Sequence, residues 1–102
     1  MSIIILSKEN YEKEVIKSKQ PVLIDFYADW CGACKTMAPI IDEIAKEKSN
    51  IKVCKANIDN EQELAVQFGV MSIPTIVLIK NAQVYNTSIG VTSKEKVLEM
   101  LN

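Results

Sequence analysis

Short apolar runs along the chain predict its strands. Val22 to Tyr27 is an almost continuous apolar run with a single charge, Asp25, which is typical of a strand buried on both faces. The residues Asn81 and Ala82 lie between the last two runs and predict the turn of an antiparallel hairpin. Four further strands are predicted on the same grounds, at 3–6, 51–58, 75–79 and 84–89.

Apolar residues at helical spacing predict the helices. The longest such pattern extends from Cys34 to Ser49, and Pro39 inside it predicts a kink. Three shorter helices are predicted: one capped by Ser7 with Tyr11, Val15 and Ile16 on one face, one over 61–68 ended by Gly69, and one from Thr92 or Ser93 to about Leu101.

The order of these elements, β-α-β-α-β-α-β-β-α, predicts an α/β fold. A strand, a helix and a strand in the middle of the chain indicate a parallel crossover, whereas the last two strands indicate an antiparallel pair. A mixed central sheet with helices on both faces follows. No repeat, low-complexity tract or linker interrupts the 102 residues, so we expect a single domain over 1–102.

Composition excludes several classes of site. Apolar residues make up 48% of the chain and charged residues 25%, and the net charge of −1 favours neither a nucleic-acid partner nor an anionic membrane surface. The chain has no His, which excludes Cys–His and Ser–His catalytic arrangements and His-based metal sites. The missing Arg argues against phosphate recognition by a guanidinium group. The N-terminal apolar run is too short for a signal peptide or a membrane span, so we expect a cytoplasmic protein.

The pair Cys31 and Cys34 carries the candidate chemistry. It lies where a buried strand passes into a helix, and the unpaired N–H groups and dipole of a helix start stabilise a thiolate. Cys31 would be that thiolate and the more exposed sulfur, and Cys34, one turn into the helix, could form a reversible disulfide with it. Half of a zinc site is the alternative, but only Cys54 remains as a further Cys ligand. A structural disulfide would close a tiny loop and stabilise little, so we favour redox exchange.

Several longer motifs surround this pair. They are Asp25-Phe26-Tyr27-Ala28-Asp29-Trp30-Cys31-Gly32-Ala33-Cys34-Lys35, Pro39, Lys55 through Asp59, Gly69-Val70, Ser72-Ile73-Pro74-Thr75 and Gly90. With them the sequence resembles the thioredoxin family over essentially its whole length, as a variant with Trp-Cys-Gly-Ala-Cys at the active site. The resemblance implies a central five-stranded mixed sheet flanked by four helices. It also implies that Cys31 attacks a substrate disulfide and that Cys34 resolves the mixed disulfide.

Asp25 has two interpretations. A carboxylate in an apolar strand is either partly exposed or buried with a raised pKa, because burial disfavours the charged form. The resemblance implies the second, with Asp25 beneath the cysteines as the proton acceptor for Cys34. Lys55 would then be its neighbour on the adjacent strand, rather than a lysine directed into solvent.

Pro74 either marks the start of a strand or forms a special turn. The resemblance implies a cis Ile73-Pro74 peptide packed against the cysteine pair, with Ile73 backbone groups free to pair with an extended substrate. It further implies an apolar docking patch around Cys31, made of Trp30, Gly32, Ala33, Ile73, Pro74, Gly90 and Val91.

The sequence departs from the family pattern at three positions. Ala33 replaces the usual Pro and restores an N–H near the sulfurs, so we expect a more oxidising couple. Tyr27 replaces a frequent Trp, which leaves Trp30 as the single Trp, and Ala82 replaces a turn Gly. Apart from these, Cys54 is either a small buried hydrophobe or a regulatory or dimer-forming thiol.

The resemblance implies a dithiol carrier that reduces protein disulfides. Its redox group would be the Cys31–Cys34 disulfide, with no further cofactor and no metal. Its partners would be disulfide-containing proteins and a thioredoxin reductase, either an NADPH-linked flavoprotein or a ferredoxin-linked enzyme, and we expect a monomer. An oxidant or isomerase, a glutaredoxin-like enzyme and a binding module that does not use its thiols are the alternatives.

Overall fold

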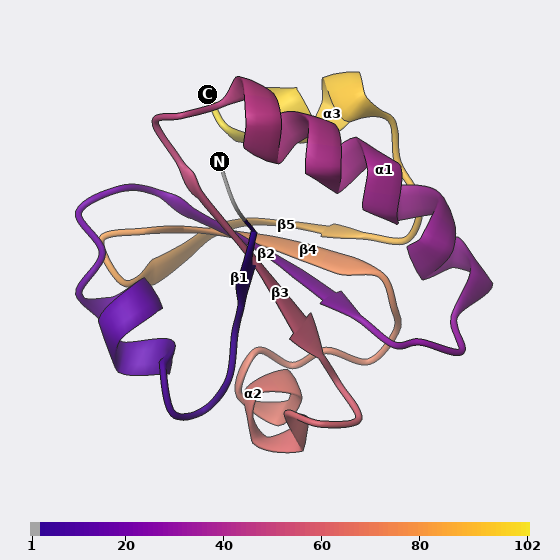
Figure 1. Ribbon diagram of the computed structural model, residues 1–102, viewed down its shortest axis with the longest axis horizontal. Coiled ribbons are helices and arrows are strands. Elements are labelled where there is room, and N and C mark those ends of the chain that lie inside the picture. The colour runs from indigo at the N-terminus through magenta and orange to yellow at the C-terminus, as the bar shows by residue number, and fades with distance from the viewer. Residues whose placement is uncertain (1–2) are drawn as a thin grey trace.

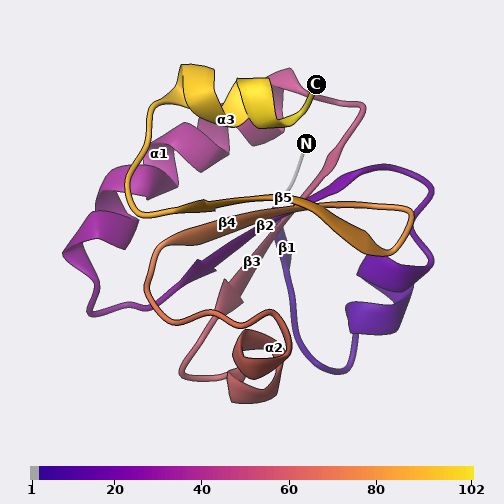
Figure 2. The ribbon, with the colours of Figure 1, turned by 180° about the vertical axis from the view of Figure 1, so that it is seen from behind.

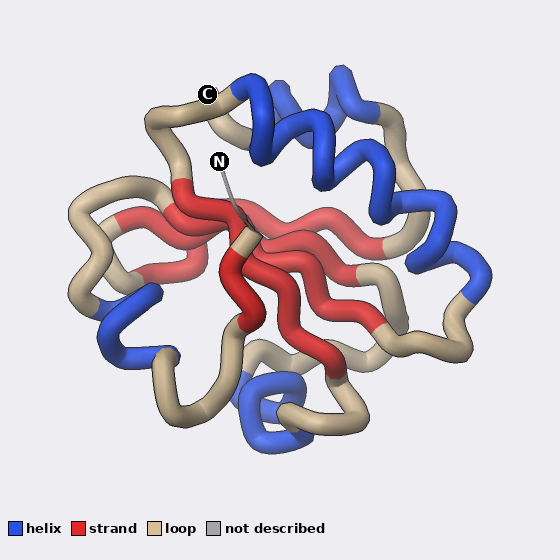
Figure 3. The backbone as a smooth tube through the Cα atoms, in the orientation of Figure 1, coloured by secondary structure: helices blue, strands red, loops and turns tan. Residues whose placement is uncertain are grey.

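The computed structural model describes residues 3–102, and its centre is a five-stranded sheet. The spatial order of the strands is β1-β3-β2-β4-β5 (Figure 1). The strands are β1 (Ile4–Ile5), β2 (Val22–Tyr27), β3 (Lys52–Asn57), β4 (Thr75–Lys80) and β5 (Gln83–Ile89). Within the described residues four helices accompany the sheet (Figure 3): η1 (Glu12–Ile16), α1 (Gly32–Glu47), α2 (Gln62–Gln67) and α3 (Lys94–Met100).

The predicted mixed α/β fold is confirmed. β2 pairs in parallel with β3 and antiparallel with β4, while β1 joins β3 in parallel and β5 joins β4 antiparallel. The central place of β2 follows from its sequence, because a strand with neighbours on both sides and helices on both faces needs apolar side chains throughout. Because β2 and β3 are parallel, their carboxyl ends meet at one edge of the sheet, from which the chain leaves β2 toward the cysteines.

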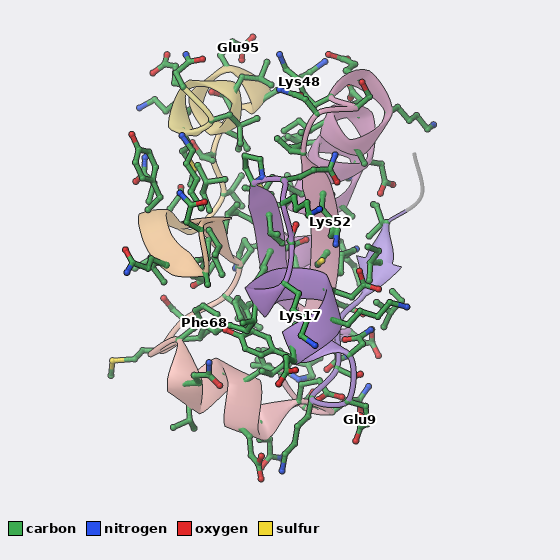
Figure 4. All side chains as sticks on the ribbon, turned by 90° about the vertical axis from the view of Figure 1, so that its left-hand side faces the viewer. Glu9, Lys17, Lys48, Lys52, Phe68 and Glu95 are labelled. Atoms are coloured by element: carbon green, nitrogen blue, oxygen red, sulfur yellow. The ribbon has the colours of Figure 1, made fainter. Side chains whose placement is uncertain are left out.

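Two apolar layers pack on opposite faces of the sheet. One layer joins Leu23 and Ile76 of the sheet to Met37 and Ile41 of α1 and to the buried face of α3. The other layer lies against η1 and α2. Figure 1 and, from behind, Figure 2 show α1 and α3 on one side of the sheet and α2 on the other. Phe68 is the residue that follows α2, and in the side view of Figure 4 its ring lies toward the sheet. The centroid of this ring is 5.4 Å from the centroid of the Phe26 ring.

The first helix differs from the prediction. It is a π-helix over Glu12–Ile16, in which the N–H of Lys17 donates to the carbonyl of Glu12 at 2.9 Å. Ser7 does not cap it: the Ser7 hydroxyl accepts instead from the N–H of Asn10, in the turn that precedes the helix. Val15 is buried as predicted, whereas Ile16 is 42% exposed.

The remaining elements end within one or two residues of their predicted bounds. α1 continues through Pro39, and the hydroxyl of Ser93, not that of Thr92, caps α3 by accepting the N–H of Lys96. The predicted hairpin turn is present, with φ of +53° at Asn81 and +64° at Ala82. Both residues therefore occupy the left-handed region that a two-residue hairpin turn requires and that glycine favours.

Candidate functional site

The redox pair lies at the start of α1, one short loop beyond the carboxyl end of β2. Cys31 is the N-cap residue of α1, and its Sγ accepts the N–H of Cys34 at 3.1 Å. Ser, Thr, Asp and Asn usually cap a helix in this way through a side-chain oxygen. Here a sulfur takes that place, so the N–H groups of the first turn are directed at the atom that would carry a thiolate charge.

The two thiols differ in how the protein surrounds them. Cys31 is 7% exposed and Cys34 is 5% exposed, so both are buried and the predicted difference in exposure is small. Burial raises the pKa of Cys34 to about 12, and the side-chain hydrogen bond that its thiol makes to the Cys31 sulfur contributes in the same direction. Cys34 therefore keeps its proton in the reduced protein. The Cys31 sulfur also lies 3.9 Å from the carbonyl oxygen of Ile73.

Asp25 lies in the buried part of β2, on the face that α1 covers. It is 1% exposed, and its Oδ1 has no hydrogen-bond partner among the described residues. Burial raises the pKa of Asp25 to about 6, Lys55 lowers it and Asp42 raises it further. A buried carboxylate oxygen without a hydrogen-bond partner lowers stability when the group is ionised.

Lys55 is the residue of β3 directly opposite Asp25 in the register. It is half-buried rather than solvated, and its Nζ lies over the ring of Tyr27, 4.7 Å from the ring centroid. A cavity of about 150 Å³ opens beside these groups. It is lined by Tyr27, Ala28, Asp29, Cys34, Lys35, Ala38 and Lys55.

The segment before β4 approaches the cysteines from the other side. The Ile73-Pro74 peptide is cis, Pro74 is buried, and Ile73 packs against the cluster that contains both cysteines. The N–H of Gly90 donates to the carbonyl of Pro74 at 2.8 Å, with φ of +88° at Gly90. The turn after β5 is thereby joined to the cis-proline segment, and Val91 follows it with 51% of its surface exposed.

Trp30 is the largest apolar group on this surface, with 68% of its surface exposed. Its ring N–H donates to Oδ2 of Asp59 at 2.8 Å, and the N–H of Asp59 donates in turn to Oδ1 of Asn57. Asp59 and Asn57 were not among the site residues predicted from the sequence, although both lie in the motif Lys55 through Asp59. The contact of Asp59 with Trp30 joins residues 29 apart in the chain. Only the place of Asn57 and Asp59 at and just beyond the end of β3, which pairs in parallel with β2, could have suggested it.

Comparisons with known proteins agree with this geometry. Residues 2–102 match the sequence model of the family described as thioredoxin. The thioredoxin of Rickettsia felis is 46% identical over 98 residues, which cover 95% of this chain and 93% of that protein. The thioredoxins of Haemophilus influenzae and Pseudomonas aeruginosa are 42% and 40% identical over 101 residues each, 98% of this chain and 94% of each relative.

The chain belongs to the thioredoxin family. Its mixed sheet with helices on both faces is the thioredoxin fold, and it is a thiol–disulfide oxidoreductase whose activity is dithiol–disulfide exchange. The family and the function expected from the sequence are thus confirmed.

Three further observations concern the chain beyond the redox pair. Cys54 is fully buried in β3 among the apolar residues that face η1 and α2, and burial raises its pKa to about 12. It lies on the opposite face of the sheet from the thioredoxin cysteine pair. Among residues 3–102 no group of three or more His, Cys, Asp or Glu side chains is arranged to hold a metal ion. No helix in this part of the chain combines the length and apolar character that crossing a membrane requires.

Proposed function

We propose that this chain reduces disulfides of other proteins by a two-electron exchange at Cys31 and Cys34. The observation that carries the proposal is the hydrogen bond from the N–H of Cys34 to Sγ of Cys31 at the start of α1. It directs the positive end of the helix at one sulfur and holds the second residue of the pair beside it.

In the first step the Cys31 thiolate attacks one sulfur of the substrate disulfide. A bond forms between Cys31 Sγ and that sulfur while the substrate S–S bond breaks, and the leaving substrate thiolate takes up a proton. The product is a mixed disulfide. In this state the Cys31 sulfur no longer accepts a hydrogen bond from the Cys34 thiol and no longer carries a negative charge beside it, and both of these effects raise the pKa of Cys34 in the reduced protein.

In the second step Cys34 loses its proton and attacks Cys31 Sγ. The Cys31–Cys34 disulfide forms, the mixed disulfide breaks, and the substrate leaves with both of its sulfurs reduced. Asp25 is the proton acceptor that we propose for Cys34. With a pKa of about 6 it is ionised at neutral pH and can accept a proton. Its negative charge raises the pKa of Cys34. Lys55, opposite Asp25, favours the ionised form.

Substrates dock on the apolar surface around the exposed edge of Cys31. Among the described residues the N–H of Ile73 has no backbone partner, so it is available to an extended substrate segment. We assign this surface to Trp30, Gly32, Ala33, Ile73, Pro74, Gly90 and Val91.

A partner must return two electrons and two protons to the Cys31–Cys34 disulfide after each cycle. We assign this role to a thioredoxin reductase, either an NADPH-linked flavoprotein or a ferredoxin-linked enzyme. We further propose that the chain works as one domain over 1–102 and as a monomer, in the cytoplasm, with its disulfide as the redox group. Residues 1–2 of that domain lie outside the described residues.

Trapping of the mixed disulfide tests the assigned order of attack. Cys34→Ser leaves Cys31 free to attack and removes the resolving thiol, so it should accumulate a covalent complex with a disulfide-containing protein. The matched variant Cys31→Ser should accumulate none, and both variants carry Cys54→Ser to remove the third thiol. Mass spectrometry of the non-reduced products measures the complex. Equal trapping by both variants would contradict the order.

A further inference from the structure

The half-buried ring of Tyr27 makes a contact that the exchange steps do not use. Asp25 and Tyr27 are two residues apart in β2, so their side chains leave the sheet on the same face. Lys55 lies directly opposite Asp25 on β3, which places it diagonally across from Tyr27. Its Nζ lies 4.7 Å from the centroid of the Tyr27 ring, within the range of a cation–π contact.

This contact is the one specific interaction of the Lys55 ammonium within residues 3–102. Lys55 Nζ forms neither an ion pair nor a hydrogen bond in that part of the chain, and Oδ1 of Asp25 has no hydrogen-bond partner there. The two charges therefore act on each other through space, without a direct bond that would fix the lysine. Because a lysine side chain has four rotatable carbon–carbon bonds and favours water, something else must hold it near Asp25.

The cavity of about 150 Å³ connects this contact to the redox pair. Tyr27, Lys55 and Cys34 all line it, and its volume is sufficient for several water molecules. A lysine held at its wall contributes positive charge where Cys34 must lose a proton. Asp29 and Lys35, which also line the cavity, are exposed.

We propose that Tyr27 is a positioning residue, whose ring holds the Lys55 ammonium beside Asp25 and the cavity at Cys34 so that Asp25 stays ready to accept the Cys34 proton. The proposal rests on the proposed function, because it assigns Tyr27 a place in the resolving step. Tyr27 also packs against the cluster of Ala28, Cys31 and Cys34, but we assign it no part in the bond exchange itself. Its proposed effect on the resolving step passes through Lys55.

Loss of the ring changes the charge around Asp25. Four groups face this carboxyl: Lys55 from β3, Asp42 and Cys34 from α1, and the apolar Ile76 from β4. Without the ring Lys55 turns toward solvent, and it then lowers the pKa of Asp25 less than before. Asp42 continues to raise that pKa. We expect the pKa of Asp25 to rise by about half a pH unit, the scale of an exposed cation–π contact.

The pH dependence follows from the pKa of Asp25, which is about 6 in the native chain. At pH 6 the ionised fraction would fall from about one half to about one quarter, so the resolving step should slow about twofold. At pH 8 Asp25 is ionised with or without the Tyr27 ring, so the rate of the resolving step should not change. Formation of the mixed disulfide by Cys31 should be unaffected at either pH.

Single-turnover kinetics on a protein disulfide such as that of insulin tests the proposal, with the formation and resolution of the mixed disulfide timed separately at pH 6 and pH 8. Tyr27→Leu should slow resolution at pH 6 alone, and Tyr27→Phe should restore it because the ring remains. Adding Tyr27→Leu to Lys55→Met should slow resolution no further, since both changes remove the same effect.

Additive effects of the two substitutions, or equal slowing at both pH values, would overturn the proposal. If circular dichroism shows that Tyr27→Leu does not fold, Tyr27→Met replaces it with the same expected result. A native chain that forms no mixed disulfide would contradict the proposed function. A native chain that forms one, beside a Tyr27→Leu variant whose resolution is unchanged at pH 6, would overturn the role of Tyr27 alone.

Discussion

Replacing Asp25 by asparagine removes a buried negative charge while keeping the size of the side chain. The pKa of Asp25 is raised from 3.8 to about 6, and burial is the main cause. The folded protein therefore binds this proton more tightly than the unfolded chain does. The contribution of this bound proton to the stability of the folded protein is fully present below about pH 4 and is lost as the pH rises through about 6.

The size of the effect follows from the two pKa values. A rise from 3.8 to about 6 corresponds to about 3 kcal/mol of unfolding free energy, an upper bound for this nearly fully buried group. At pH 8, where Asp25 is ionised, Asp25→Asn should therefore be more stable than the native chain by up to about 3 kcal/mol. At pH 4, where the native Asp25 is protonated when folded, the gain should nearly vanish.

Urea unfolding of the reduced proteins between pH 4 and pH 8, followed by Trp30 fluorescence, measures this difference. Taking the difference in unfolding free energy between the variant and the native chain removes the contributions of the other titrating groups, which the two proteins share. Asp29→Asn, which removes an exposed carboxylate from the loop after β2, is the matched control and should stay within about 0.5 kcal/mol at every pH. A difference for Asp25→Asn that stays flat across the range, or that falls as the pH rises, would refute the reasoning.

Three smaller predictions concern the turn, the third thiol and the redox couple. Ala82→Gly should raise the unfolding free energy by about 0.5–1 kcal/mol in urea unfolding, because φ of +64° strains an alanine; a loss of stability would contradict this. In the oxidised native protein Cys54 should resist a thiol reagent until the protein unfolds, since it is fully buried with a pKa raised to about 12; a reactive native thiol would show that it is accessible. Titration against glutathione should give Ala33→Pro a more negative potential than the native chain, because proline removes an N–H donor that favours the reduced thiolate; a less negative value would contradict the expectation.

The sequence predicted the sheet because local patterns determine it. Val22–Tyr27 is apolar throughout except for Asp25, and the observed strand has the predicted bounds. The start of α1 was predicted two residues late, at Cys34, because propensity rules look for an oxygen at the cap and here the sulfur of Cys31 accepts the hydrogen bond. The cysteine pair itself was evident from its spacing.

Other features depend on contacts that no local pattern contains. The hydrogen bond of Trp30 with Asp59 and the position of Lys55 over Tyr27 arise only when β2 and β3 lie side by side in their observed register. The π-helix at Glu12–Ile16 was predicted as an ordinary helix, because apolar spacing over so few residues does not distinguish the two.

The most direct test of the central claim is the reduction of insulin by dithiothreitol with and without catalytic amounts of this protein. Cys31→Ser is assayed beside the native chain. We predict strong acceleration by the native chain and none by the variant, because the Cys31 sulfur at the start of α1 makes the first attack. No acceleration by a correctly folded native chain would contradict the account and would favour a binding module that does not use its thiols.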